Sequence, residues 1–259
     1  MGIRDLQEFI ETHCQQACKH VDLVQVARGF ALQSRNSKKR GGGTPQQLRL
    51  VVDAESCLHK LYGGFFSDWA CGGQWNRMMA FLSNLVHTCR ASNLDLVVFF
   101  NGALEGQRTD EWFQQQADIY KNIQGVIGHI HHKATPPPKA WWVPPPMLSS
   151  CLRLALRQLG VSVACSMDDH HQEVIAYCRE YSLHGVLAQD ADYAVFDPPR
   201  YFSAHHLKLT YRGSLETQEY LIDDLAKAID LHPKRFCILA ALLGWFFYLL
   251  YEMNASAGY

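Results

Sequence analysis

The sequence has no excess of charge of either sign and none of the bias typical of disordered or fibrous chains. Lys and Arg together number 24 and Asp and Glu number 25, which leaves a formal net charge of −1. A strongly basic nucleic-acid clamp is therefore excluded, and any nucleic-acid binding must come from a local patch. With 48% hydrophobic and 19% charged residues, the 259-residue chain is long enough and apolar enough to bury a sizeable core.

The cysteines lack the spacing of a metal-binding pair. There are nine of them, an odd number, and no two are separated by only two residues. This pattern argues against a zinc ribbon. It also favours an intracellular protein in which the cysteines are mostly small core residues.

A run long enough to span a membrane is also missing. The uncharged segment 236–251 is shorter than the roughly 20 residues that a membrane-spanning helix needs. We expect this segment to form a buried helix, and we expect no stable membrane insertion.

Short apolar runs alternate with helical patterns along the chain. The runs predicted as strands cover residues 48–52, 94–100, 161–164 and 185–188, with a further edge strand over 207–211. The segments predicted as helices cover residues 6–20, 54–61, 75–89, 107–125, 148–159, 169–181 and 221–229. This alternation predicts an α/β fold in which helices cover both faces of a parallel sheet.

Polar side chains follow three of the predicted strands. They are Asp53, Asn101, and the pair Asp190 and Asp192, while the acidic pair Asp168 and Asp169 lies where a predicted helix begins. Side chains at the carboxyl ends of parallel strands meet at one edge of the sheet, and carboxylates that meet there need a cation or protons. Mg²⁺ takes oxygen ligands and bridges to phosphate, so the pattern predicts a metal-dependent phosphodiester site. Each Asp taken alone is also typical of a helix cap or a turn.

Four motifs lie at the chain start and at these strand ends: Met1-Gly2-Ile3-Arg4-Asp5-Leu6, Val51-Val52-Asp53-Ala54, Phe99-Phe100-Asn101-Gly102 and Gln189-Asp190-Ala191-Asp192-Tyr193. In them the chain resembles the flap-endonuclease superfamily of XPG-type, PIN-like domains. Further motifs lie at residues 61–64, 71–75, 133–138, 168–175 and 201–204. In these the chain is similar to the constitutive coactivator of PPAR-gamma family, and within it to the PPAR-gamma-like protein 1 branch.

The resemblance implies a domain organisation. A PIN-like domain covers residues 1–244, and a divergent apolar tail covers residues 245–259. The chain is then expected to lack the C-terminal part of the nuclease core, as a truncated or alternatively spliced form would.

The resemblance also implies a set of metal ligands, because the nuclease members bind two divalent cations through carboxylates. The carboxylates that remain here are Asp53, Asp169, Asp190 and Asp192. The positions that depart from the set are Asn101, His171, Trp245 and Phe246. Because two-metal hydrolysis needs an ion at each reacting oxygen, we expect a vestigial site with no catalytic residue, no required cofactor and at most one weakly held Mg or Mn ion.

His171 also has an interpretation that needs no metal. It lies at helical spacing from Met167, Val174 and Cys178, which predicts a partly buried, hydrogen-bonded histidine.

The basic patch of the chain is short. Lys38, Lys39 and Arg40 lie in residues 35–44, which we expect to form a flexible loop. They are candidates for weak nucleic-acid binding, and a solvated loop is the alternative.

The function predicted from these observations is noncatalytic. By its resemblance the chain is expected to be an RNA-associated regulatory or scaffold protein in the cytoplasm and nucleus, with signalling or transcription-regulatory proteins as partners. One alternative is a weak Mg- or Mn-dependent structure-specific nuclease. Another is a protein-binding adaptor that presents residues 136–146, which hold two Pro-Pro-Pro runs, as a polyproline ligand.

Overall fold

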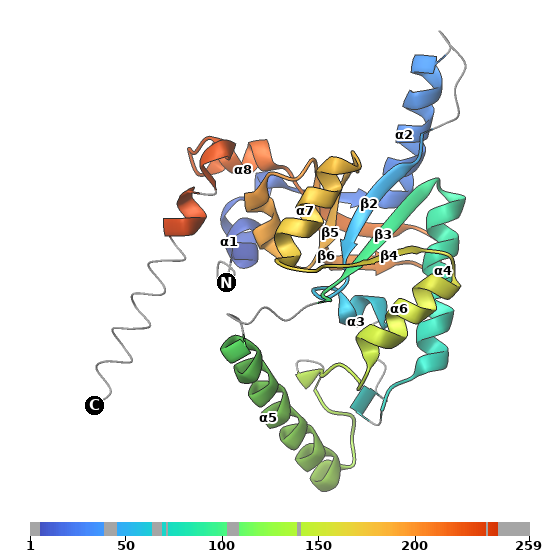
Figure 1. Ribbon diagram of the computed structural model, residues 1–259, viewed down its shortest axis with the longest axis vertical. Coiled ribbons are helices and arrows are strands. Elements are labelled where there is room, and N and C mark those ends of the chain that lie inside the picture. Colours follow the sequence, from blue (N-terminus) through green and yellow to red (C-terminus); the bar gives the residue numbers. More distant parts are fainter. Residues whose placement is uncertain are drawn as a thin grey trace.

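A seven-stranded sheet forms the centre of the molecule (Figure 1). The computed structural model describes residues 6–38, 46–63, 69–70, 72–102, 109–138, 141–236 and 238–242. The strands are β1 (Cys18–Asp22), β2 (Leu48–Asp53), β3 (Leu94–Phe100), β4 (Ser162–Cys165), β5 (Gly185–Ala188), β6 (Tyr201–Leu209) and β7 (Leu215–Tyr220), and they lie side by side in the order β1-β7-β6-β5-β2-β3-β4.

The sheet is mixed. Strands β4, β3, β2, β5 and β6 run parallel, as the sequence predicts, whereas β7 is antiparallel to β6 and β1 is antiparallel to β7. The sheet therefore departs from the predicted parallel arrangement at one edge. The reason is a tight turn: the backbone N–H of Thr210 donates to the carbonyl of Ser214, and this turn reverses the chain where a parallel connection would need a long crossover.

Helices cover both faces of the sheet. They are α1 (Leu6–His13), α2 (Leu23–Lys38), α3 (Leu58–Leu61), α4 (Trp75–Ala91), α6 (Leu148–Gln158), α7 (His170–Glu180) and α8 (Ile222–Ala228), while the helix α5 (Thr109–Lys133) stands apart from the sheet. Alternate residues of β2 point to opposite layers, since Leu50 and Val52 join the cluster under α2, α4 and α6, while Val51 joins the cluster under α1, α7 and α8. Burial on both faces explains why the central strands read as almost unbroken apolar runs.

The N-terminal region differs from the sequence-based prediction. The predicted helix 6–20 ends at His13, and residues 18–22 instead form β1, with Cys18 opposite Tyr220. Pairing with β1 gives the outer backbone groups of β7 partners, and this outweighs the helical spacing of the apolar residues. The helix α2 then runs to Lys38, so the predicted loop 35–44 is helical in its first four residues.

The uncharged segment near the end is described only in part. Phe236 is buried, but Ile238, Leu239 and Leu242 are exposed, so the prediction of a buried helix is wrong for residues 238–242. Residues 243–259, which include the predicted tail 245–259 with Trp245 and Phe246, lie outside the described residues. None of the described helices is long enough and apolar enough to cross a membrane.

Candidate functional site

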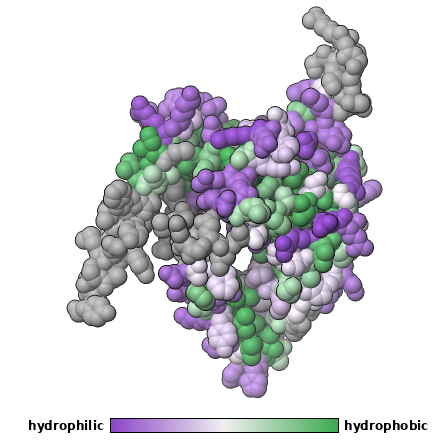
Figure 2. All heavy atoms as spheres, viewed as in Figure 1, coloured by the Kyte–Doolittle hydropathy of each residue, from purple (hydrophilic) through white to green (hydrophobic). Residues whose placement is uncertain are grey.

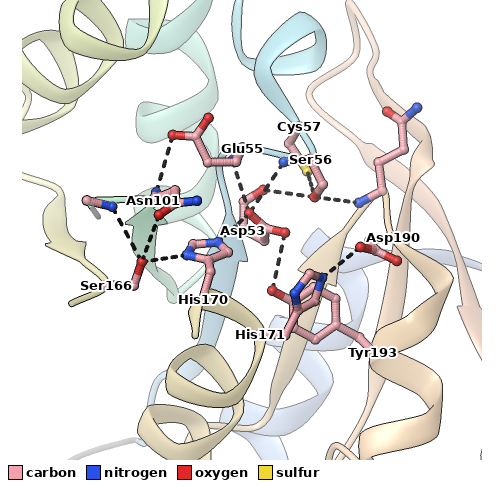
Figure 3. A network of polar contacts seen from close by, with 12 residues as sticks. Asp53, Glu55, Ser56, Cys57, Asn101, Ser166, His170, His171, Asp190 and Tyr193 are labelled. Carbon is pink, nitrogen blue, oxygen red and sulfur yellow. Dashed lines mark hydrogen bonds and ion pairs between the residues drawn. The ribbon is translucent and has the colours of Figure 1, made fainter. Parts of the chain in front are cut away.

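The candidate site lies where the carboxyl ends of β2, β3 and β5 meet the start of α7 (Figure 3). Asp53 is the last residue of β2, Asn101 directly follows β3, and Asp190 lies two residues after β5. The parallel pairing of β2 with both β3 and β5 brings these ends to one edge of the sheet. The structure thus assembles the strand-end residues that the sequence singles out.

Asp53 is the most buried carboxylate of the site, with 2% of its surface exposed. Its Oδ1 lies 2.9 Å from Nε2 of His170 and accepts backbone N–H donors of Glu55 at 3.0 Å and Ser56 at 3.4 Å. Its Oδ2 accepts the hydroxyl of Tyr193 at 3.2 Å. Both oxygens of this carboxylate are therefore already bonded to donors of the protein itself.

These donors decide the ionisation of Asp53. Burial alone would raise the pKa of Asp53, but the hydrogen bond and charge attraction of His170, with the hydrogen bonds of Ser56, outweigh it and hold the pKa below its ordinary value. Burial, together with the nearby charges of Asp53 and Asp190, raises the pKa of Tyr193 far above its ordinary value, so Tyr193 stays a donor. The carboxylate remains ionised because the protein solvates it from within.

His170 links Asp53 to the neighbouring strand end. Its Nδ1 lies 3.0 Å from Oγ of Ser166, and that hydroxyl donates to Oδ1 of Asn101 at 3.4 Å. The N–H of Gly102 donates to the same Oγ at 3.4 Å. His170 and Ser166 are both buried, so this chain of hydrogen bonds crosses the site below its surface.

His171 forms a second carboxylate–imidazole pair, with Asp190. Its Nε2 lies 2.8 Å from Oδ2 of Asp190, and its ring stacks on Phe196 and packs tilted against Tyr193. The hydrogen bond to Asp190 raises the pKa of His171; burial opposes this rise, and the charges of Asp190, Asp53 and Asp169 add to it. The prediction of a partly buried, hydrogen-bonded histidine is confirmed. Its supposed neighbour Met167, however, lies before the helix and is exposed.

The other acidic residues of the site also have partners within the protein. Asp169 is the N-cap of α7 and accepts the N–H of Gln172 at 2.8 Å. The N–H of Asp192 donates to Asp190 at 3.0 Å. Glu55, not singled out from the sequence, accepts the hydroxyl of Ser149 at 3.1 Å and the N–H of Asn101 at 3.2 Å, and burial raises its pKa despite these bonds.

Lys38, the first residue of the predicted basic patch, lies away from this site. Lys38 is the last residue of α2, whose Ser34 accepts the N–H of Gln46 just before β2 begins. That is the amino end of β2, whereas Asp53 is at its carboxyl end (Figure 1). Lys39 and Arg40 lie outside the described residues.

The donor set does not fit a two-ion centre. A divalent ion binds the lone pairs of carboxylate oxygens, and at Asp53 hydrogen-bond donors of the protein already surround those oxygens. Asp190 shares its carboxylate between His171 and the N–H of Asp192, and Asp169 caps a helix. Within the described ranges, no group of three or more Asp, Glu, His or Cys side chains is arranged to hold a metal ion.

Sequence reasoning missed His170, the main partner of Asp53. The available signal was the spacing of His170, Val174 and Cys178 at i, i+4 and i+8, all of which are buried on the inner face of α7. His171 lies beside this face and is only partly buried. Nothing in the sequence singled out Ser166. Its role depends on the contact of its hydroxyl with the ring of His170, which forms only when the chain folds.

We predict that the His171–Asp190 pair makes stability depend on pH. A histidine with a raised folded pKa stabilises fully below its ordinary pKa of about 6.5, and this contribution is lost as the pH rises through the folded value. The difference in free energy of unfolding between wild type and His171→Gln should therefore be largest just below the ordinary histidine pKa and shrink as the pH rises above it. Urea denaturation at each pH measures it. The exposed His132→Gln variant is the control, and an equal difference at every pH would contradict the prediction.

Comparison with solved structures shows the fold. The structure of human GEN1 bound to Holliday junction DNA aligns with 93% of this chain, and the alignment covers 50% of the GEN1 chain. The TM-score is 0.55 and the sequence identity is 14%. The catalytic core of Rad2 in complex with a DNA substrate also aligns with 93% of this chain, and the alignment covers 62% of the Rad2 chain. The TM-score is 0.53 and the sequence identity is 13%. At this identity the likeness establishes a PIN-like α/β fold of the XPG type and nothing about activity.

Comparison with curated proteins shows the family, although no protein-family model matches the chain. The constitutive coactivator of PPAR-gamma-like protein 1 homolog of Xenopus tropicalis is 50% identical over 249 residues, which are 94% of this chain and 23% of the relative. The human constitutive coactivator of PPAR-gamma-like protein 1 is 49% identical over 245 residues, 94% of this chain and 22% of the relative. The chain thus spans under a quarter of these relatives. Over the region compared, it belongs to the constitutive coactivator of PPAR-gamma family.

Proposed function

We propose that the domain is a noncatalytic scaffold that keeps the fold of a nuclease without its two-metal chemistry. The observation that carries this proposal is the pairing of the two strand-end carboxylates: Asp53 with His170 at 2.9 Å and Asp190 with His171 at 2.8 Å. Both carboxylates would have to exchange these bonds for metal bonds before an ion could bind. Hydrolysis by two ions would require this exchange at both pairs. It would also require a carboxylate at position 101, where this chain has the neutral amide Asn101.

The bonds at Asp53 are costly to exchange because Asp53 and His170 are buried. Displacing His170 would leave an imidazole without its partner in a site that excludes water, and an unpaired buried polar group costs about 1–3 kcal/mol. At most one weakly held Mg²⁺ or Mn²⁺ would then bind, at the more open Asp190, whose side chain is 32% exposed. No cofactor is required for a scaffold role.

The regulatory part of the proposal rests on the relatives. Their names describe constitutive coactivators, which supports signalling or transcription-regulatory proteins as partners. We extend this to association with RNA and to a place in the cytoplasm and nucleus, as the family resemblance implies. Lys38, Lys39 and Arg40 are the candidate contacts with phosphates.

The alternative of a weak nuclease rests on a specific observation. The fold is that of DNA-bound nucleases, and Asp53, Asp190 and Asp192 still lie at the strand ends where such folds bind ligands. The polyproline adaptor is less favoured, because Pro137 and Pro145 are buried and Pro145 packs within 3.2 Å of the position of a Cβ on Gly73. A docking ligand needs these prolines exposed.

The nuclease alternative is tested by incubating the chain with flap, hairpin and single-stranded substrates in Mg²⁺ and in Mn²⁺. We predict that wild type shows no cleavage above the level of Asp190→Asn. The variant Asp197→Asn removes an exposed carboxylate from the same segment and serves as the matched control. Cleavage that Asp190→Asn abolishes and Asp197→Asn retains would contradict the scaffold proposal.

RNA association is tested by measuring the affinity for single-stranded RNA at several salt concentrations. We predict that replacing Lys38, Lys39 and Arg40 with Gln together weakens binding and reduces the slope of log K against log salt by about 2, since each phosphate contact on a single strand contributes about 0.7. A control replaces the exposed Lys19, Lys227 and Lys234 with Gln. Equal loss in both variants, or no binding by wild type, would contradict a role for this patch.

A further inference from the structure

Helix α5 carries an apolar strip that is exposed to solvent, in which the ring of Phe113 also packs edge-on against Trp112 of the same helix. One strip packs on the body: Val126 is buried, and Ile119 and Ile130 pack partly against the core. A neighbouring strip is open to solvent. Its members are Phe113, Tyr120 and Ile127, which are 60%, 64% and 61% exposed, and Ile123, which is 37% exposed. We call these four residues the α5 seam.

The helix stands apart from the layers of the sheet, along the lower edge of the molecule (Figure 1). In the space-filling view, hydrophobic residues lie just above the hydrophilic lower tip, where α5 ends (Figure 2). Because the seam residues are exposed to solvent, a second helix could contact them.

The seam has the spacing of a coiled coil. Phe113, Tyr120 and Ile127 are seven residues apart, and Ile123 follows Tyr120 by three, as do the a and d positions of a heptad. Ile130 continues the d positions at the edge of the packed strip. A helix that packs only against the core of its own domain needs one apolar strip, and in α5 that strip is the one around Val126. The additional apolar seam therefore indicates a second helix as its partner.

The charges of α5 are separated along its length. Its first half carries Asp110, Glu111 and Asp118 and no Lys or Arg. Its second half carries Lys121, His129, His131, His132 and Lys133 and no Asp or Glu. This order complements the helix dipole, but the dipole gives no reason for the exposed seam. Two such helices side by side would repel in a parallel pair and attract in an antiparallel one.

We propose that the seam docks a second copy of this chain as an antiparallel helix pair. With Tyr120 of one copy beside Ile123 of the other, Phe113 meets Ile130, and Asp110 lies by the end that carries His131 and Lys133. Each contact then occurs twice, as a two-fold interface requires. The seam spans two heptads, so the expected dissociation constant is on the order of 10 µM.

Sedimentation equilibrium of the full chain tests the pairing. Wild type should be a dimer at about 100 µM and a monomer at about 1 µM. Ile127→Glu buries a charge in the seam and should raise the dissociation constant at least about tenfold. Leu154→Glu makes the same kind of change at an exposed leucine of α6 and should leave it unchanged. Circular dichroism confirms that each variant folds.

A charge exchange tests the direction. Asp110→Lys should weaken the dimer, and adding His131→Glu to it should reverse this loss, because opposite charges then face each other in the antiparallel pair. A parallel pair would show no such restoration. A wild type that stays monomeric at every concentration, or a dimer that Ile127→Glu does not weaken, would overturn the proposal.

Discussion

The pairing of Asp53 with His170 is the constraint on which the site depends. Parallel strands that end in carboxylates gather negative charge at one edge of the sheet, and this charge must be neutralised or solvated there. Here the protein itself does so, with an imidazole, two backbone N–H groups and a tyrosine hydroxyl around Asp53. Breaking a buried pair of this kind by removing one partner costs about 3–5 kcal/mol, because the remaining group stays buried without its partner.

The carboxylate–imidazole pairs also connect neighbouring elements of the fold. The hydrogen bonds from Asp53 through His170 and Ser166 to Asn101 join the ends of β2 and β3 to the loop before α7. The second pair, between His171 and Asp190, joins the start of α7 to the segment after β5. The edge of the sheet is thus held together by side chains, which is the feature on which the proposed scaffold role rests.

The sequence predicts the central strands well because each is buried on both faces and reads as an apolar run that ends in a polar residue. It does not predict β1, because the formation of β1 depends on pairing with a segment far along the chain. It also misses β7, because Leu215–Tyr220 is largely polar and has no apolar run. The same limit applies to the site. Asp53, Asn101 and Asp190 follow from their places at strand ends, whereas His170 acquires its role only when α7 packs across the end of β2.

The most direct test of the account is the stoichiometry and affinity of Mn²⁺ binding, measured by isothermal titration of wild type and Asp190→Asn. The account predicts at most one ion per chain, with a dissociation constant of about 1 mM or weaker, that Asp190→Asn removes. Two ions bound per chain at micromolar concentrations would show that the carboxylates exchange their imidazole partners for metal readily, and would contradict the account.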